Sequence, residues 1–209
     1  RYYSRDPMNI TRVQTVRKIV LFIASTIAIF LFAVTDTVYP SGHSVHELVE
    51  WAGLLLIVIC ILGRTWSSLY IAGRKGRELV TNGPYSTCRN PLYFFSIIGA
   101  AGMGMQSGSV LLGLICGAIT AVVFLIVTIQ EEQLLTKVHG RKYRSYIAAV
   151  PRFIPNPHLW RDTKALTIQP PRVLMTFADA LVFLLAVPVA EGFEYLRESG
   201  IIPTLLILP

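Results

Sequence analysis

Two polar stretches of the sequence concentrate the residue types that bind and activate small molecules. The first, RKGRELVTNGPYSTCRNPLY, covers residues 74–93, and the second, EEQLLTKVHGRKYRSYIAAVPRF, covers residues 131–153. Each combines carboxylates, cationic side chains and tyrosines. Together they supply acceptors for hydroxyl groups, donors for an anion, and aromatic or apolar walls for a ring. We therefore expect these stretches to form a site for a charged, nucleoside-like molecule.

The elements around these stretches are those of an integral membrane protein. The chain of 209 residues is 53% hydrophobic and only 15% charged, with a mean hydropathy of +0.56, which is more apolar than a soluble domain of this length. The apolar residues form long blocks rather than amphipathic stripes. The net charge of +7 comes from Lys and Arg between these blocks, a pattern typical of cytoplasmic loops and not of a nucleic-acid-binding surface.

The apolar blocks predict an all-α fold with about five transmembrane helices in a single domain, residues 1–209. A spanning helix needs about 20 largely apolar residues. The predicted spans are residues 19–38, 48–72, 92–105, 110–130 and 173–190. The first is long enough to be an anchor rather than a cleaved signal peptide. The tail, residues 200–209, is too short to span and is expected to pack on the bundle or lie in the interface.

Local signals set the ends of these helices. Gly and Ala residues within 99–104 would let the third and fourth spans pack as a tight hairpin. The fourth helix should continue past Glu131 and Glu132 and stop at Gly140. Asp179 and Pro188 weaken the prediction of the fifth span. Prolines between residues 151 and 157 exclude a long helix after the second polar stretch.

The basic segments predict one topology. The N-terminal segment, residues 73–91 and residues 131–172 carry most of the Lys and Arg, and two predicted spans separate each pair. All three should therefore lie on the cytoplasmic side, and residues 36–47 and 191–198 outside. The protein is expected in the inner membrane if it is bacterial, with the site facing the cytoplasm.

The order and spacing of the polar residues resemble a known signature. Leu79 and Val80 precede a Gly-Pro-Tyr and then an Arg-Asn-Pro-x-Tyr motif; a Glu pair, a Gly, two spaced Tyr and Val-Pro follow. The matching residues are Glu78, Leu79, Val80, Gly83, Pro84, Tyr85, Arg89, Asn90, Pro91, Tyr93, Glu131, Glu132, Gly140, Tyr143, Tyr146, Val150 and Pro151. This pattern, over roughly residues 64–155, resembles the isoprenylcysteine carboxyl methyltransferase-like family, related to phospholipid N-methyltransferases. Asn90 stands where that family often has His, and His139 where it has Phe.

The resemblance implies a membrane methyltransferase that uses S-adenosyl-L-methionine and acts on a lipophilic acceptor similar to an isoprenylcysteine carboxylate. The expected catalytic residues are Arg89, Glu131 and Arg152. The expected cofactor-binding residues are Glu78, Leu79, Val80, Tyr85, Asn90, Pro91, Leu92, Tyr93 and Glu132. The expected substrate-binding residues are Arg64, Tyr70, Tyr143 and Tyr146. The acceptor would be a lipophilic small molecule or lipidated substrate that arrives from the membrane.

The residues themselves support such a site. Tyr85 and Tyr93 are expected to help wall an adenine, and Glu131 or Glu132 to accept ribose hydroxyls. Arg89, with the N–H groups at the start of the third span, suits a carboxylate, because a helix N-terminus favours anions and Pro91 suits the first turn.

Each feature also has a simpler interpretation. Arg89 to Pro91 can be a basic flank before a helix, the Glu pair a solvated helix end, and the Tyr pair an interfacial belt. Arg64 either snorkels or pairs with a carboxylate inside the span. The four His and three Cys residues show no metal-ligand spacing, so no metal site is predicted.

Other functions stay open at this stage. A phospholipid N-methyltransferase or a thiol S-methyltransferase would use the same cofactor. A non-enzymatic lipid-binding membrane protein would bind no cofactor, and a lipid or sterol reductase would need a nicotinamide cofactor.

Overall fold

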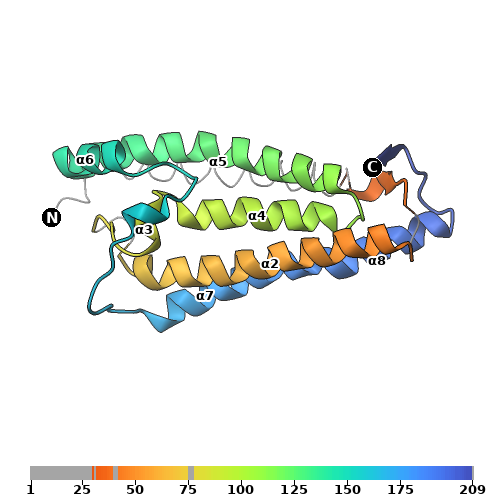
Figure 1. The fold of residues 1–209 in the computed structure, drawn as a ribbon, viewed down its shortest axis with the longest axis horizontal. Helices are drawn as coiled ribbons and strands as arrows, with labels where there is room; N and C mark the ends of the chain where they lie inside the picture. The colour runs from red at the N-terminus through yellow and green to blue at the C-terminus, as the bar shows by residue number, and fades with distance from the viewer. Residues whose placement is uncertain (1–29, 31, 40–41, 75–77, 209) are drawn as a thin grey trace.

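The computed structural model describes residues 30, 32–39, 42–74 and 78–208, and these form an elongated helical bundle (Figure 1). The all-α prediction is confirmed, apart from two strands of three residues each. The helices are α2 (Ser44–Ile71), α3 (Pro84–Thr87), α4 (Pro91–Met105), α5 (Val110–His139), α6 (Arg141–Ala149), α7 (Pro170–Leu181) and α8 (Ala186–Glu198), with 3₁₀ helices η1 (Pro157–Leu159) and η2 (Val182–Leu185). The strands are β1 (Thr35–Thr37) and β2 (Leu206–Leu208).

Among the described residues, three helical stretches are long and apolar enough to cross a membrane: α2, α5, and the run from Pro170 to Glu198. The outward face of α2 is apolar. Leu48, Trp51, Leu55 and Leu62 are all more than half exposed on one helix. Exposed apolar side chains at this density fit contact with lipid acyl chains.

Glycines allow α2, α4 and α5 to pack backbone against backbone. A Cβ added at Gly102 of α4 would lie 2.5 Å from the carbonyl oxygen of Gly53 in α2. One added at Gly104 would lie 2.7 Å from the carbonyl oxygen of Leu112 in α5. The predicted close hairpin of the third and fourth spans is thus confirmed, because no larger residue fits at these positions.

The fifth predicted span, residues 173–190, is longer in the structure and changes helix type in the middle. Helix α7 passes into η2 and then α8 without leaving the helical path. Pro188 explains the change: it has no N–H, and its ring would clash with the carbonyl of Leu184 in a regular α-helix. Helix α8 continues past the predicted end at residue 190 and includes the polar residues Glu191 and Glu194.

The end of the first predicted span needs a correction. Most of residues 19–38 lie outside the described residues, but Thr35–Thr37 form strand β1 rather than the last turn of a helix. β1 pairs in parallel with β2, so the C-terminal tail is held as a short strand. The β-branched Thr35 and Thr37 favour an extended backbone, which the hydropathy of the block does not register.

The bundle has two ends with different chemistry. At one end α2 and α5 finish and α4 and α7 begin; we call it the Arg89 end. At the other end α2 and α5 begin and α4 and α8 finish; we call it the His46 end (Figure 1). Helix α4 has 15 residues and α5 has 30, so α5 extends well past the start of α4 at the Arg89 end. The two polar stretches fill the space beside this extension.

Candidate active site

The segment before α4 is anchored by a glycine that no other residue can replace easily. Gly83 has φ of +60°, and a Cβ there would lie 2.2 Å from Cε1 of the Tyr70 ring in α2. The short helix α3 follows at once. The N–H of Gly83 donates to the carbonyl of Arg161 at 2.7 Å, and the Ser86 hydroxyl accepts from the N–H of Arg161 at 2.9 Å. The segment is therefore tied both to α2 and to the chain after η1.

Backbone hydrogen bonds join the two polar stretches directly. The N–H of Arg89 donates to the carbonyl of Pro151 at 2.8 Å, and the N–H of Asn90 donates to the carbonyl of Arg152 at 3.2 Å. The side-chain amide of Asn90 donates to the same carbonyl. The predicted meeting of the two stretches at one end of the bundle is confirmed. It brings Arg89 and Arg152 side by side, although 62 residues separate them.

A buried carboxylate of α5 lies between these two arginines. Glu132 is 7% exposed. Its Oε1 is 3.1 Å from Nη1 of Arg89, and Arg152 donates from Nε at 3.2 Å and from Nη2 at 2.9 Å. Buried charge must be paired, and Glu132 balances one of the two guanidinium charges, while the adjacent Glu131 carboxylate adds a second negative charge to the same group. Within the described part of the chain, Nε and Nη1 of Arg89 are buried without a well-formed hydrogen bond.

Beside this cluster, an aromatic pair connects α4 and α5. The Tyr93 ring stacks on Phe124 with centroids 4.5 Å apart, and the Tyr93 hydroxyl donates to Oε1 of Glu131 at 3.1 Å. Adjacent carboxylates thus face different partners: Glu131 contacts Tyr93, and Glu132 contacts the arginines. Since α5 continues as a helix to Gly140, with φ of +56°, both carboxylates lie inside the helix and not at a solvated end.

Three tyrosines form a buried layer under the segment. The Tyr146 hydroxyl donates to the carbonyl of Tyr85 at 2.6 Å, and Tyr143 lies against Tyr146 with ring centroids 5.9 Å apart. Leu79 and Val150 pack on the same layer. Burial raises the pKa of Tyr143 to about 12 and also raises the pKa of Tyr85 and Tyr146, so all three phenols stay neutral. Their burial does not fit the interfacial-belt interpretation.

An apolar cavity of about 380 Å³ lies on the other side of the same segment. Its walls come from α2, α3, α4 and the chain around η1: Trp66, Pro84, Thr87, Cys88, Pro91, Phe95, Pro155, Pro157 and Trp160. The rings of Trp66 and Trp160 stack 5.6 Å apart. Cys88 lines the cavity while the neighbouring Arg89 enters the ionic cluster. This cavity was not predicted from the sequence, although the Trp and Pro residues within 155–160 signal it.

The remaining predicted site residues lie at varied distances from the cluster. Asn90, Pro91 and Leu92 begin α4 within it. Tyr70 donates to Asp162 at 3.0 Å and meets edge-on the ring of Trp66, which is one wall of the cavity. Glu78 is exposed and lies 4.0 Å from Arg74, and Val80 is half-buried; no described contact brings either to Glu132.

Among the described residues, Arg64 forms no ion pair with a carboxylate, which was one of the two expectations. Its Nη1 donates to the hydroxyl of Ser96 in α4, and its guanidinium lies 5.9 Å from the centre of the Phe183 ring. Within the described residues its Nε is buried without a partner. In the described part of the chain, the Ser96 hydroxyl and the face of the Phe183 ring therefore take the place of the expected carboxylate partner.

The comparisons with known proteins agree with this architecture. Residues 48–142 match the family described as phospholipid methyltransferase. The chain is 33% identical over 175 residues to the nickel-cobalt-cadmium resistance protein NccN of Alcaligenes xylosoxydans xylosoxydans, covering 81% of this chain and 82% of that protein. The chain belongs to the phospholipid methyltransferase family. The resemblance to isoprenylcysteine carboxyl methyltransferase-like proteins is thereby confirmed at the level of the family.

A second relative of this member of the phospholipid methyltransferase family matches over nearly the same length of the chain. It is the cobalt-zinc-cadmium resistance protein CzcN of Cupriavidus metallidurans, 30% identical over 173 residues, 80% of each chain. No solved structure matches. The matched family region runs from within α2 to the start of α6. It contains the whole first polar stretch and the second one as far as Lys142. Membership implies a membrane methyltransferase and a methyl donor such as S-adenosylmethionine.

Proposed function

We propose that the chain transfers a methyl group from S-adenosyl-L-methionine to a lipophilic acceptor that enters the Arg89 end from the membrane. The observation that carries this proposal is the position of Arg89. Its guanidinium is buried at the start of α4 and pairs with Glu132, and among the described residues its Nε has no hydrogen-bond partner. The apolar cavity begins at the next residue, Cys88. An anionic head group and an apolar chain would thus meet within one segment.

The residues of the cluster fit the proposed cofactor. The N–H groups of Arg89 and the N-terminus of α4 suit the carboxylate of an amino-acid head. The stacked Tyr93 and Phe124 offer a flat wall for adenine, and Glu131 supplies an acceptor for ribose hydroxyls. S-adenosylmethionine supplies an electrophilic methyl group on a sulfonium. Glu132 and Arg152 act on the cofactor indirectly, because they hold Arg89 in place.

The apolar cavity fits the chain of a lipid or a prenyl group. Its volume lies in the range of small-molecule sites, and its walls are almost entirely aromatic rings and prolines. Trp66 and Trp160 suit the membrane interface, where one edge of the ring is apolar and the other wet. Tyr70, fixed by Asp162, stands at its border and would orient the acceptor.

The protein's contribution to the reaction would be positioning and exclusion of water. A carboxylate or thiolate acceptor is already a nucleophile and needs no general base, which favours an isoprenylcysteine-like carboxylate or a thiol. A phospholipid amine must first lose a proton, and Glu131 beside Tyr93 is the carboxylate placed to take it. Methylation of a phospholipid amine is therefore the second form of the same proposal.

We place the Arg89 end on the cytoplasmic side of the membrane, in the inner membrane if the cell is bacterial. Helix α6 and the chain after it carry Arg141, Lys142, Arg144, Arg152 and Arg161 at this end, and Lys and Arg concentrate on the cytoplasmic side of membrane proteins. The names of the two relatives also lead us to propose that this methylation contributes to tolerance of nickel, cobalt, zinc or cadmium ions.

Calorimetry on the detergent-solubilised chain, with S-adenosylmethionine as titrant, tests the cofactor. We expect binding by wild type, a loss of at least tenfold in Glu132→Gln and Tyr93→Ala, and none in Cys116→Ala, which is buried in α5 away from the cluster. Wild type that binds nothing would refute the enzyme and favour a lipid-binding protein without a cofactor. Competition by a nicotinamide dinucleotide would instead indicate a reductase.

Transfer of labelled methyl from the cofactor to membrane extracts tests the acceptor. Radioactivity that partitions with base-labile esters would identify a carboxylate, and radioactivity in phosphatidylethanolamine derivatives would identify the phospholipid amine. Growth in graded Ni²⁺, Co²⁺, Zn²⁺ and Cd²⁺, with wild type against Glu132→Gln, tests the role in metal tolerance.

A further inference from the structure

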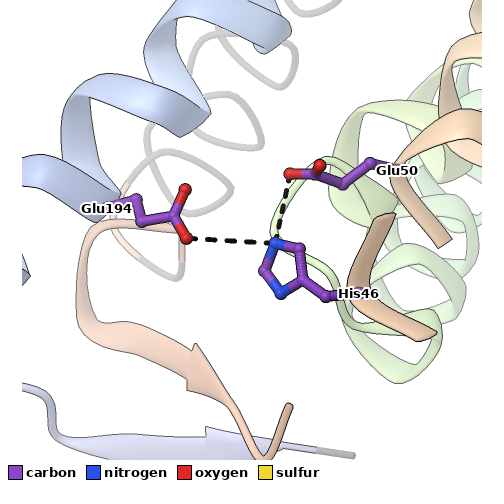
Figure 2. A group of neighbouring side chains, drawn as sticks. All are labelled: His46, Glu50 and Glu194. Atoms are coloured by element: carbon purple, nitrogen blue, oxygen red, sulfur yellow. Dashed lines mark hydrogen bonds and ion pairs between the residues drawn. The ribbon is translucent and has the colours of Figure 1, made fainter. Parts of the chain in front are cut away.

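A histidine and two carboxylates meet at the His46 end, far from the site above (Figure 2). His46 and Glu50 lie one turn apart on α2, and Glu194 comes from α8, 144 positions further along the chain from Glu50. Nε2 of His46 is 3.2 Å from Oε1 of Glu50 and 4.0 Å from Oε1 of Glu194. One ligand atom from each residue lies within 4.8 Å of the others.

The ring of His46 is held so that Nε2 faces both carboxylates. His46 is 5% exposed, and its Nδ1 lies 3.0 Å from the carbonyl oxygen of Tyr39. A carbonyl only accepts, so Nδ1 carries a hydrogen and donates it. Neutral His46 then presents the lone pair of Nε2 to two carboxylate oxygens, an arrangement that is repulsive unless a cation lies between them. The cation is either a proton on Nε2 or a metal ion.

The charge balance favours a divalent ion. Two carboxylates, Glu50 and Glu194, face the same imidazole nitrogen, and a third, Glu191, lies one turn before Glu194 on α8. Among the residues that the structure describes, neither Glu50 nor Glu194 pairs with a lysine or arginine. Arg197, on the same helix as Glu194, is engaged with Asp36 and the carbonyl of Phe32.

The distances also suit a transition-metal ion. Nitrogen and oxygen ligands at about 2.1 Å from a tetrahedral ion are roughly 3.4 Å from each other. The His46–Glu50 separation of 3.2 Å is already close to that value, the His46–Glu194 separation of 4.0 Å needs to shorten by roughly half an ångström, and the oxygens of Glu50 and Glu194, which lie within 4.8 Å, would also move closer on binding. One His with carboxylates is a set that Zn²⁺, Co²⁺ and Ni²⁺ accept, with water completing the coordination.

We propose that His46, Glu50 and Glu194 bind one divalent transition-metal ion, which clamps α2 to α8 at the His46 end. Neither polar stretch contributes a ligand, so the site is independent of the proposed methyl transfer. The contact between His46 Nδ1 and the Tyr39 carbonyl holds the ring in the orientation that the ion requires. Gly108 leaves room for that ring, because a Cβ there would lie 2.3 Å from Nδ1.

Cobalt is the probe, because its visible absorption reports ligand geometry. The full chain, freed of any affinity tag and stripped with chelator, is titrated with Co²⁺ in detergent micelles and then back-titrated with Zn²⁺. We expect wild type to bind one Co²⁺ with a visible band that Zn²⁺ removes. Glu194→Gln, which keeps the side-chain shape, should lower the affinity at least tenfold, as should Glu50→Gln and His46→Ala.

Matched controls separate this site from metal binding elsewhere. Glu47→Gln changes an exposed carboxylate next to His46, and His158→Ala removes a histidine of the Arg89 end; both should bind Co²⁺ as wild type does. Glu132→Gln should also bind Co²⁺ normally, even where methyl transfer fails. The proposal is wrong if wild type shows no band, which leaves a protonated His46, or if Glu194→Gln binds as tightly as wild type. Circular dichroism of each variant verifies that the helices are intact.

Discussion

The two ends of the bundle arrange their charged side chains in opposite ways. At the Arg89 end one carboxylate, Glu132, lies between two guanidinium groups. At the His46 end one imidazole, His46, lies between two carboxylates. At the Arg89 end the two guanidinium groups are balanced by Glu132 and the adjacent Glu131, whereas the partly exposed Glu50 and Glu194 have no lysine or arginine partner among the described residues. The difference indicates a cation at the His46 end, while the Arg89 end offers an anion the Nε donor of Arg89, which has no partner within the described part of the chain.

The largest effect should follow from removing the central carboxylate of the first cluster. Glu132→Gln leaves Arg89 and Arg152 without a counter-charge, and we expect a loss of about 3 kcal/mol in unfolding free energy, because breaking a buried pair strands its partner. Denaturant unfolding in micelles measures it. Glu131→Gln, which breaks one contact with Tyr93, is the matched control with a smaller loss. Equal losses would show that the two arginines do not depend on Glu132.

The second pair of variants tests each end with the same chemical change. Gly83→Ala and Gly108→Ala both place a Cβ within 2.3 Å of a ring, at Tyr70 and at His46, where φ is +60° and +74°. Each should cost about 2 kcal/mol in unfolding free energy. The functional effects should separate: Gly83→Ala lowers methyl transfer and spares Co²⁺ binding, whereas Gly108→Ala does the reverse.

Gly192→Ala is the control for both substitutions. No atom of the described residues lies within 4 Å of a Cβ added at this helical glycine of α8, so a methyl group there should be neutral or stabilise the helix by about 0.5 kcal/mol. If Gly108→Ala lowered methyl transfer as much as Gly83→Ala does, the two ends would be coupled, and their separation in function would be disproved.

The sequence predicted the Arg89 end far better than the His46 end, for a physical reason. Apolar length and Gly140 located α5, and the signature located Arg89 and the Glu pair, because these residues lie in two continuous stretches. The His46 group depends on Glu194, which only the course of α8 brings near α2. A rule based on local spacing cannot find it, and the expectation of no metal site considered only the spacing of histidines and cysteines.

Other misses also depend on tertiary contacts. Trp66 and Trp160 form one wall only after the chain past η1 folds back on α2. Ser96 became the partner of Arg64 because α4 packs closely on α2, a contact that hydropathy cannot rank. The pairing of β1 with β2 joins positions near the two ends of the chain. By contrast, the η2 segment followed from a residue already visible, Pro188.

A smaller effect should come from Tyr93→Phe. This change keeps the ring on Phe124 and removes the hydroxyl that donates to Glu131. A hydrogen bond to a charged acceptor is worth about 1.5 kcal/mol, and we expect that loss in unfolding free energy. If Glu131 with Tyr93 orders the ribose, cofactor affinity should fall as well, and Tyr93→Ala should lower it further. An unchanged affinity in both variants would remove this pair from the proposed site and leave Arg89 as its centre.

The smallest effect concerns Cys88, which lines the apolar cavity next to Arg89. Burial raises the pKa of its thiol from 9.0 to about 12, despite the adjacent guanidinium. Since the folded pKa lies above the unfolded value, the neutral thiol persists at pH 8, and reaction with iodoacetamide should be slow. A variant with Cys60→Ala and Cys116→Ala, which retains only Cys88, should label after detergent denaturation and hardly at all when native. The stabilising effect of the neutral thiol should disappear as the pH rises from about 9 towards 12. Rapid labelling of the native protein at pH 8 would mean that the Arg89 guanidinium, and not the apolar cavity, governs this thiol.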